Sequence, residues 1–311
     1  MFHLICKKYR ERDAIILEGV SDFSLRDTLE CGQAFRYELL ADGEDYKEYL
    51  TVVGDTLVFI GQSADGTLAF YGTDEDTVRT LIIPYLSLDT DYGKIREEII
   101  SATESEWLKC AAEASRGIRI LRQEPAETLL SFIISQNNNI PRIRGIIRKI
   151  SAEYGKNLAL PSGVCPKTGE KIDESVCRGC GICYSFPRPE DIRERPEGLV
   201  AAKLGFRYGY LLDAVEKIVS GEINLEDIKS KHSLEYTLAE LKKIRGVGDK
   251  VASCAALFSL ENLDAFPIDV WMKRAIDTYF DGSLDVPSLG KYAGIAQQYI
   301  FHYIRNVEEK A

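Results

Sequence analysis

The spacing of the apolar residues changes near residue 74, and this change most constrains how the chain can fold. Between about residues 12 and 71, short alternating runs are separated by turn residues, which is typical of strands. After residue 74 the apolar residues recur with a helical period. We therefore expect an α+β chain with an N-terminal antiparallel sheet domain over residues 1–115 and a mostly helical domain over residues 116–311.

The individual runs predict where these elements lie. Strands are expected at Ala14–Leu17, Phe35–Leu39, Tyr49–Val53, Thr56–Ile60 and Leu68–Tyr71. Helices are expected near 74–86, 91–115, 125–136, 140–154, 196–203, 208–219, 235–244, 249–260, 269–280 and 289–305.

Composition excludes several classes of protein. No run of about 18 apolar residues is present, so no membrane-spanning helix is expected. The N-terminus lacks the long apolar region of a secretory signal, and we expect a cytoplasmic protein. Eight cysteines without such a signal favour thiols or metal ligands over a disulfide framework.

The net charge of −10 does not exclude nucleic acid as a partner, because binding depends on the local charge. Acidic residues are concentrated in the first hundred residues, whereas residues 128–152 contain arginine and lysine but no Asp or Glu. The segment 242–250 adds four more cations against one aspartate. The charge is therefore segregated along the chain.

Two glycines between helical patterns form the most informative motif, in the segment Leu241-Lys-Lys-Ile-Arg-Gly-Val-Gly-Asp-Lys-Val. Gly246 and Gly248 bring bare backbone close to a ligand, so several N–H groups can point at one anion. A helix is expected to start there with Asp249 as its N-cap, which adds the positive helix end to the anion site.

A lysine and an aspartate lie beside this hairpin. Lys250 is in the first helical turn, and the apolar residues after it predict partial burial, which favours the uncharged, nucleophilic amine. Asp269 follows Pro267 at the start of another expected helix, where it can act as an N-cap. A phosphate grip, an amine and a carboxylate together suggest a DNA-repair lyase.

These residues resemble the helix-hairpin-helix motif and aspartate of the base-excision DNA glycosylases, and within them the 8-oxoguanine DNA glycosylases most closely. The resemblance implies a helix-hairpin-helix glycosylase domain, a monomer, no catalytic cofactor and duplex DNA with oxidised guanine as partner. It also implies that Lys250 is the Schiff-base nucleophile, which adds strand-nicking lyase activity, and that Asp269 stabilises charge developing on the sugar.

The resemblance extends to Ser135-Gln-Asn-Asn-Asn-Ile-Pro-Arg and Leu204-Gly-Phe-Arg. In the family, the residues matching Asn137, Arg142 and Arg207 hold the cytosine left unpaired after the damaged guanine is flipped out. Phe206 matches the aromatic wedge that fills the base stack. Without the resemblance, the asparagines could form a polar turn, Phe206 could be a core residue and Arg207 a surface charge.

A further set of residues matches the family's pocket for the flipped base. The resemblance implies that the Gly32 carbonyl accepts the additional N–H of 8-oxoguanine, that Phe301 and Cys254 contact the two faces of the base, and that Gln297 binds its Watson–Crick edge. Phe301 alone could equally be a core aromatic. Trp271 departs from the histidine of many eukaryotic members, so its role at a phosphate stays open.

Four cysteines, in a Cys-rich insert at about 162–186, lie within 19 residues: Cys165, Cys177, Cys180 and Cys183. Two overlapping CxxC pairs bring three sulfurs together, and Cys165 can supply the fourth. A structural Zn²⁺ site is the preferred interpretation. An iron–sulfur cluster and four free thiols are the alternatives.

The leading hypothesis is a bifunctional glycosylase that excises 8-oxoguanine paired with cytosine and then cleaves the strand by β-elimination. One alternative is a helix-hairpin-helix glycosylase for alkylated or other damaged bases, which leaves Gly32, Gln297 and Phe301 as coincidences. The other is a non-catalytic DNA-binding module, against which the spacing of Lys250 and Asp269 argues.

Overall fold

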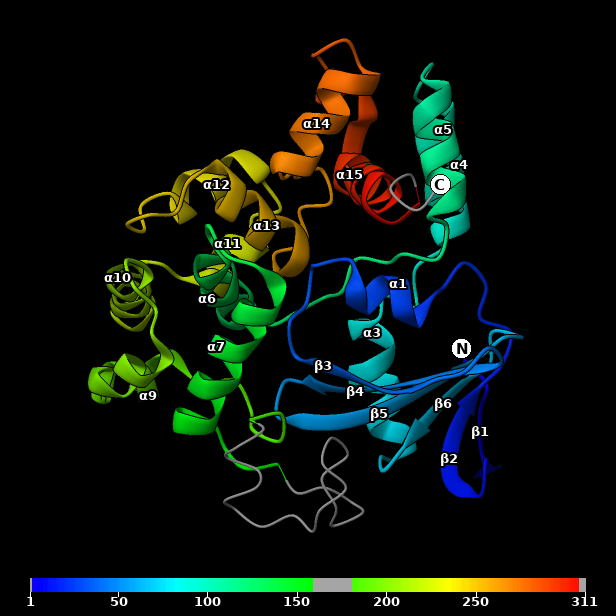
Figure 1. Ribbon diagram of the computed structural model, residues 1–311, viewed down its shortest axis with the longest axis horizontal. Coiled ribbons are helices and arrows are strands. Elements are labelled where there is room, and N and C mark those ends of the chain that lie inside the picture. The colour runs from blue at the N-terminus through cyan, green and yellow to red at the C-terminus, as the bar shows by residue number, and fades with distance from the viewer. Residues whose placement is uncertain (1, 159–180, 308–311) are drawn as a thin grey trace.

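The computed structural model describes residues 2–158 and 181–307, which form a β-sheet beside a larger body of helices (Figure 1). The strands are β1 (Leu4–Tyr9), β2 (Arg12–Leu17), β3 (Tyr37–Asp42), β4 (Tyr46–Val53), β5 (Thr56–Ser63) and β6 (Leu68–Tyr71). They pair antiparallel in the order β1-β2-β6-β5-β4-β3. The predicted α+β class and antiparallel sheet are confirmed. Strand β1 was not predicted, because this edge strand exposes Cys6 and two lysines and shows no regular alternation.

Both faces of the sheet carry apolar side chains, in agreement with the period of two. Ile15 and Leu17 of β2 belong to one cluster, and Ile16 between them belongs to another. The first cluster is completed by α1 (Leu25–Glu30) and by a continuous helical segment of α2 (Glu75–Thr77), η1 (Val78–Ile82) and α3 (Ile83–Tyr85). Figure 1 shows α1 between the sheet and the C-terminal helices. The sheet therefore reaches the helical body through α1.

The helical body consists mainly of α4 (Tyr92–Ser101), α5 (Glu106–Ala114), α6 (Pro125–Ser135), α7 (Ile140–Tyr154), α9 (Pro189–Glu194), η2 (Pro196–Ala202), α10 (Arg207–Val219), α11 (Leu225–Ser230), α12 (Leu234–Leu241), α13 (Asp249–Ser259), α14 (Val270–Tyr279), η3 (Val286–Tyr292), α15 (Ala293–His302) and η4 (Tyr303–Val307). The expected single helix over 91–115 is wrong. The chain leaves the helix after Ser101, and Ser105 then caps α5 by accepting a hydrogen bond from the Leu108 amide. Three short helices, α1, α9 and α11, were not predicted, since six residues give little periodic signal.

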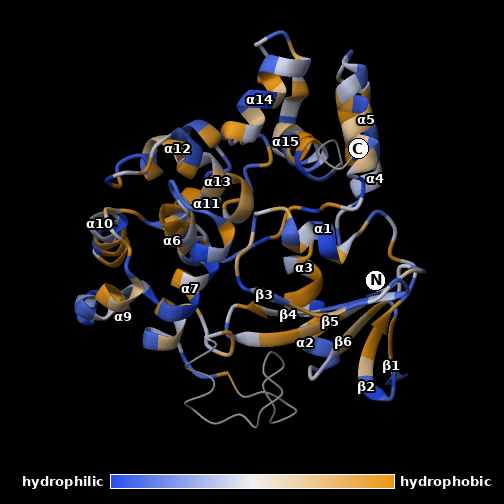
Figure 2. Cartoon of the chain, viewed as in Figure 1, coloured by the Kyte–Doolittle hydropathy of each residue, from blue (hydrophilic) through white to orange (hydrophobic). Residues whose placement is uncertain are grey.

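Helices α4 and α5 pack with the C-terminal helices. Tyr92, Ile95 and Leu108 belong to the apolar cluster that also contains α6, α13 and α15. Figure 2 shows hydrophobic and hydrophilic residues mixed along α5, as expected of a helix that buries one face. Helices before and after residue 115 therefore share one apolar core. The domain boundary at residue 115 stays a prediction.

Among the described helices, none has the length and apolar character needed to cross a lipid bilayer.

Candidate active site

Lys250 and Asp269 lie in one open region of the surface. Lys250 is in the first turn of α13, and Asp269 is the N-cap of α14. Both residues line two adjoining hollows, of about 350 Å³ and about 470 Å³. The smaller hollow is lined by Gly32, and we call it the Gly32 pocket. The larger is lined by Gly248, and we call it the Gly248 pocket. The amine and the carboxylate therefore meet where the two pockets join.

The Lys250 amine lies against an aromatic ring. Its Nζ is 5.1 Å from the centre of the Phe132 ring, which comes from α6. Cys254, one turn further along α13, is fully buried, and burial raises the pKa of its thiol to about 11. The positive charge of Lys250 opposes this rise in the Cys254 pKa, whereas the negative charge of Asp269 adds to it. The thiol, the amine and the carboxylate thus lie within electrostatic reach of one another.

The carboxylate of Asp269 is oriented by its own helix. Its Oδ1 accepts hydrogen bonds from the backbone amides of Trp271, at 3.0 Å, and Met272, at 2.9 Å. The predicted cap is therefore present, and it fixes the side chain at the mouth of both pockets. The expected cap by Asp249 is wrong, because Gly248 occupies the N-cap position and Asp249 is the first residue of α13. Asp249 is exposed and forms an ion pair with Lys242 at 2.9 Å.

The two glycines of the hairpin have different roles. Gly246 has φ +79°, and a Cβ built on it would lie 2.3 Å from Cδ2 of Tyr210. Both the left-handed backbone and the close approach of Tyr210 therefore require glycine there. A Cβ on Gly248 would meet nothing within 4 Å, and Gly248 lines the open pocket. Gly246 thus builds the turn, whereas Gly248 leaves space in front of the α13 N-terminus, a favourable place for an anion.

The Gly32 pocket joins segments that are far apart in the sequence. Gly32 follows α1 with φ +88°, and a Cβ on it would lie 3.9 Å from Cε1 of Phe301 on α15. The pocket also contains Phe35, Phe132, Trp271 and Arg305. Gly32 and Phe301 therefore lie together at the pocket that Lys250 also lines.

Two predicted pocket residues lie deeper. Gln297 is buried on α15, and its Oε1 accepts a hydrogen bond of 2.7 Å from Nε2 of Gln298. Cys254 is buried behind Lys250. Neither side chain is among the described residues that line the Gly32 pocket. Their contacts with a base remain predictions.

The residues expected to hold an unpaired cytosine lie near the Gly248 pocket. Asn137 lines that pocket in a turn with φ +47°, and Arg142 is exposed at the start of α7. Phe206 is 51% exposed, which fits a wedge better than a core residue. Arg207, by contrast, is buried and donates hydrogen bonds to the carbonyls of Gln136 and Asn137. Arg207 therefore stabilises the asparagine-rich turn in this structure.

The charge of the site differs from the simple sequence pattern. Arg144 and Arg148 of the acid-free segment form ion pairs with Glu38 of β3, so they contribute less to the surface than expected. Burial, and then the positive charge of Arg142, lowers the pKa of Arg207. A cation that the sequence analysis missed, Arg305, lines the Gly32 pocket. Its position four residues after Phe301, on the same helical face, was the available signal.

The predicted zinc ligands Cys165, Cys177 and Cys180 lie outside the described residues. Cys183 is fully buried in the apolar cluster on one face of the sheet. In residues 2–158 and 181–307, no group of three or more His, Cys, Asp or Glu side chains is placed to hold a metal ion.

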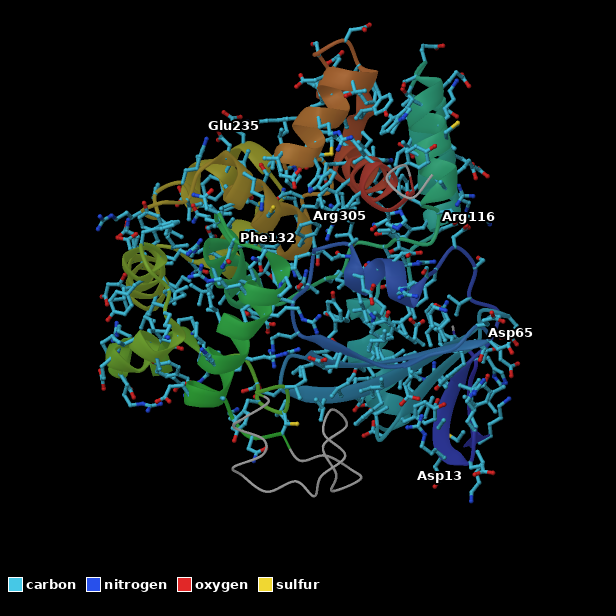
Figure 3. All side chains as sticks on the ribbon, viewed as in Figure 1. Asp13, Asp65, Arg116, Phe132, Glu235 and Arg305 are labelled. Carbon is cyan, nitrogen blue, oxygen red and sulfur yellow. The ribbon has the colours of Figure 1, made fainter. Side chains whose placement is uncertain are left out.

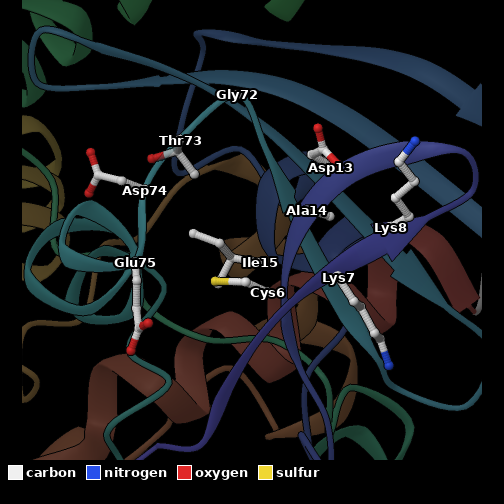
Figure 4. A pocket seen from close by; sticks show the side chains of 10 residues that line it. All are labelled: Cys6, Lys7, Lys8, Asp13, Ala14, Ile15, Gly72, Thr73, Asp74 and Glu75. Carbon is white, nitrogen blue, oxygen red and sulfur yellow. The ribbon is translucent and has the colours of Figure 1, made fainter.

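A larger hollow, of about 750 Å³, lies far from this chemistry (Figure 4). It is formed by β1, β2 and the turn at 72–75, with Lys7, Lys8, Asp13, Asp74 and Glu75 around its rim. These mixed charges are spread over an open surface. We therefore place the candidate active site at Lys250 and Asp269.

Known proteins resemble this chain over most of its length. Residues 15–129 match the family model of the 8-oxoguanine DNA glycosylase N-terminal domain. The N-glycosylase/DNA lyase of Saccharomyces cerevisiae is 27% identical over 276 residues, covering 82% of this chain and 67% of the yeast protein. The 8-oxoguanine glycosylase/lyase of Clostridium acetobutylicum, solved with duplex DNA containing cytosine opposite 8-oxoguanine, is 33% identical with a TM-score of 0.82, covering 100% of this chain and 99% of that one. The DNA complex of MBOgg1 gives 33% identity and a TM-score of 0.83, covering 99% of each chain.

Proposed function

Because the chain belongs to the 8-oxoguanine DNA glycosylase family, we propose that it removes 8-oxoguanine paired with cytosine through a Schiff base on Lys250. The protein is a DNA N-glycosylase with lyase activity at apurinic or apyrimidinic sites, and duplex DNA that contains the oxidised base is its partner. The single observation that carries the role of Lys250 is its place beside Asp269 at the junction of two pockets.

The proposed chemistry gives Lys250 and Asp269 separate roles. The uncharged Lys250 amine attacks C1′ of the damaged nucleotide, and the base leaves with its bonding electrons and takes up a proton. Asp269 stabilises the positive charge that develops on the sugar, since its carboxylate is already oriented by the α14 cap. The C1′–O4′ bond then breaks and O4′ takes up a proton, so the sugar ring opens to an imine with Lys250. Loss of a C2′ proton and departure of the 3′ phosphate complete the β-elimination, which cleaves the strand and leaves an unsaturated sugar on the imine.

We assign the flipped base to the Gly32 pocket. The Gly32 carbonyl would accept the N–H that guanine lacks, and a carbonyl left unpaired by guanine would cost about 1–3 kcal/mol. Phe301 would stack on the base, with Cys254 backing the other side and Gln297 binding the Watson–Crick edge. The half-buried ring of Phe301 at the Gly32 turn supports this assignment.

We assign the DNA backbone and the unpaired cytosine to the other side of the site. Gly246 and Gly248 would present backbone amides to a phosphate at the α13 N-terminus. Asn137 and Arg142 would bind the cytosine, with Phe206 inserted in the base stack. Arg207 would bind the cytosine only if it released one of its hydrogen bonds to the carbonyls of Gln136 and Asn137. With those bonds intact, Arg207 contributes by stabilising the turn that carries Asn137.

Covalent trapping tests the proposal. The protein is incubated with an 8-oxoguanine:cytosine duplex and borohydride, which reduces the imine to a stable amine link. We expect a cross-linked complex with the wild type and none with Lys250→Gln. A trap that persists in Lys250→Gln would reject Lys250 as the nucleophile. Trapping with an alkylated base instead would favour the alternative glycosylase, and no trapping with any damaged duplex would favour a binding module.

We keep the structural Zn²⁺ at Cys165, Cys177, Cys180 and Cys183 as a separate proposal. Its support is the spacing of the four sulfurs in the sequence. Metal analysis of the purified protein should give one zinc per chain, and iron in its place would favour the cluster. A protein purified without zinc or iron, whose thermal stability does not change when either metal is added, would reject both.

A further inference from the structure

Arg305 brings a cation into the Gly32 pocket. It lies in η4, directly after α15, and lines the pocket together with Gly32, Phe301, Lys250 and Asp269. Figure 3 labels it beside the end of α15, with Phe132 labelled on α6. A Cβ built on Gly32 would lie 3.9 Å from Nη1 of Arg305, the same distance as from the Phe301 ring. The guanidinium thus faces the space next to the Gly32 backbone.

Within residues 2–158 and 181–307, this guanidinium has a weak contact with one aromatic ring. Its carbon lies 5.6 Å from the centre of the Phe301 ring, a weak cation–π contact. In the parts of the chain that the structure describes, Arg305 forms no ion pair and no hydrogen bond. Two other arginines near the site are engaged, since Arg144 pairs with Glu38 and Arg207 binds backbone carbonyls. A half-buried arginine that lines an open pocket, with no hydrogen-bond partner among the described residues, is placed to bind a ligand.

The charge and the donors of Arg305 select between classes of damaged purine. Oxidised purines are uncharged and carry an additional carbonyl oxygen, which accepts a hydrogen bond from a guanidinium. Purines alkylated at N7 or N3 carry a positive charge on the base and add no such acceptor. A fixed cation in a pocket of low dielectric repels a cationic base and binds a carbonyl by a charge-assisted hydrogen bond.

We propose that Arg305 is a specificity-determining residue that binds an oxygen of the flipped oxidised purine and excludes cationic, alkylated purines from the Gly32 pocket. This inference rests on the proposed function, because it assumes that the damaged base enters that pocket. It adds a contact from the end of the chain to those already assigned to Gly32, Phe301 and Gln297.

The test uses the full-length protein, three duplexes and three substitutions. The duplexes contain 8-oxoguanine, N7-methylguanine or an abasic site, each opposite cytosine. Arg305→Met removes both charge and donors, Arg305→Lys keeps the charge but loses the planar fork, and Arg305→Gln keeps a donor without the charge. Arg193→Met is the matched control, since it removes one arginine from the exposed surface of α9.

The expected pattern separates the donors from the charge. Arg305→Met should lower single-turnover excision of 8-oxoguanine by about 10- to 100-fold, the usual range for one charge-assisted hydrogen bond. Cleavage at the abasic site should fall far less, because no base occupies the pocket there. Excision of N7-methylguanine relative to 8-oxoguanine should rise in Arg305→Met and Arg305→Gln but not in Arg305→Lys.

Two results would overturn the inference. The first is an Arg305→Met protein with the wild-type ratio of the two excision rates, as expected for Arg193→Met. The second is a parallel fall in base excision and abasic-site cleavage, in Arg305→Lys as well as in Arg305→Met, which would indicate a structural role. Failure of the proposed function looks different, because the wild type itself would then neither excise 8-oxoguanine nor cleave the abasic strand.

Discussion

The hairpin and the Gly32 pocket meet at Lys250 but are built in opposite ways. The hairpin, its lysine and the capped aspartate come from one stretch of about 25 residues, between Gly246 and Asp269. The Gly32 pocket needs the turn after α1, the ring of Phe132 on α6 and the last helical turns of the chain. Short-range geometry thus supplies the chemistry, whereas long-range packing supplies the shape that selects the base.

The two regions should therefore control different properties: the hairpin the reaction rate on all substrates, and the Gly32 pocket the choice of base. Changes in the hairpin should affect every substrate, including an abasic site, because all substrates use the same amine and phosphate grip. Changes in the Gly32 pocket should affect only substrates that carry a base.

The largest effect is expected from Asp269→Asn. Asparagine caps helices as well as aspartate does, so the bonds to the amides of Trp271 and Met272 should persist and stability should change little. Loss of the negative charge should slow excision of 8-oxoguanine by about 10²- to 10³-fold, the usual cost of removing one preorganised electrostatic group. Single-turnover kinetics measure the rate, and thermal unfolding checks the cap. A full-rate Asp269→Asn protein would limit Asp269 to its structural role.

Phe301→Ala should have the next largest effect, and only on substrates with a base. Stacking on an aromatic side chain is worth about 1–3 kcal/mol per base, so excision of 8-oxoguanine should fall by about 10- to 100-fold. Phe301→Leu keeps the apolar contact with the Gly32 turn but loses the ring, and is the matched control. Cleavage of an abasic duplex is measured alongside. An equal loss on both duplexes would contradict the separation of the two regions.

The contrast also explains which parts of the protein the sequence could predict. The Asp269 cap depends on residues that are neighbours in the chain, and it was predicted. The close approach of Tyr210 to Gly246 joins residues far apart in the sequence, and it was not predicted. The break before Ser105 was missed, because a serine cap interrupts an apolar pattern that otherwise continues. Arg207 and Arg305 show the limit most clearly. Whether an arginine binds backbone carbonyls or faces an open pocket depends on segments brought close by folding.

The two hairpin glycines give a smaller effect, on stability. In Gly246→Ala a methyl group meets the Tyr210 ring at a left-handed backbone position, so the free energy of unfolding should fall by about 1–3 kcal/mol. Gly248→Ala should cost less than about 1 kcal/mol, because its Cβ enters open space. Urea denaturation measures both.

Duplex affinity should reverse this order. Gly248→Ala puts its methyl group where we expect a phosphate, so it should weaken duplex binding. Gly246→Ala should weaken it less, when the affinity is calculated for the folded protein alone. Wild-type affinity in Gly248→Ala would show that the phosphate does not approach that glycine.

The smallest effect concerns acid stability beside the Gly32 pocket. Nδ1 of His302, on α15, shares a hydrogen bond of 3.0 Å with the Ser115 hydroxyl. Nε2 of the same ring lies 3.5 Å from Oδ1 of Asp27 on α1. Burial opposes ionisation of Asp27, but the hydrogen bonds from His302 and Ser24, with the positive charges of His302 and Arg26, hold the pKa of its carboxyl below the usual value. The ionised carboxylate therefore stabilises the fold.

Asp27→Asn tests this contact. A carboxyl whose folded-state pKa is lowered stabilises above its unfolded pKa of about 4, and the contribution disappears as the pH falls through the lower, folded value. The wild type should thus exceed Asp27→Asn in unfolding free energy near neutral pH, by less than about 1 kcal/mol because the carboxylate is partly exposed. The difference should shrink as the pH falls below the unfolded pKa, whereas Asp76→Asn, an exposed change on α2, should show no such trend. A difference that stays constant as the pH is lowered would mean that packing alone joins α1 to α15, without a contribution from the charge of Asp27.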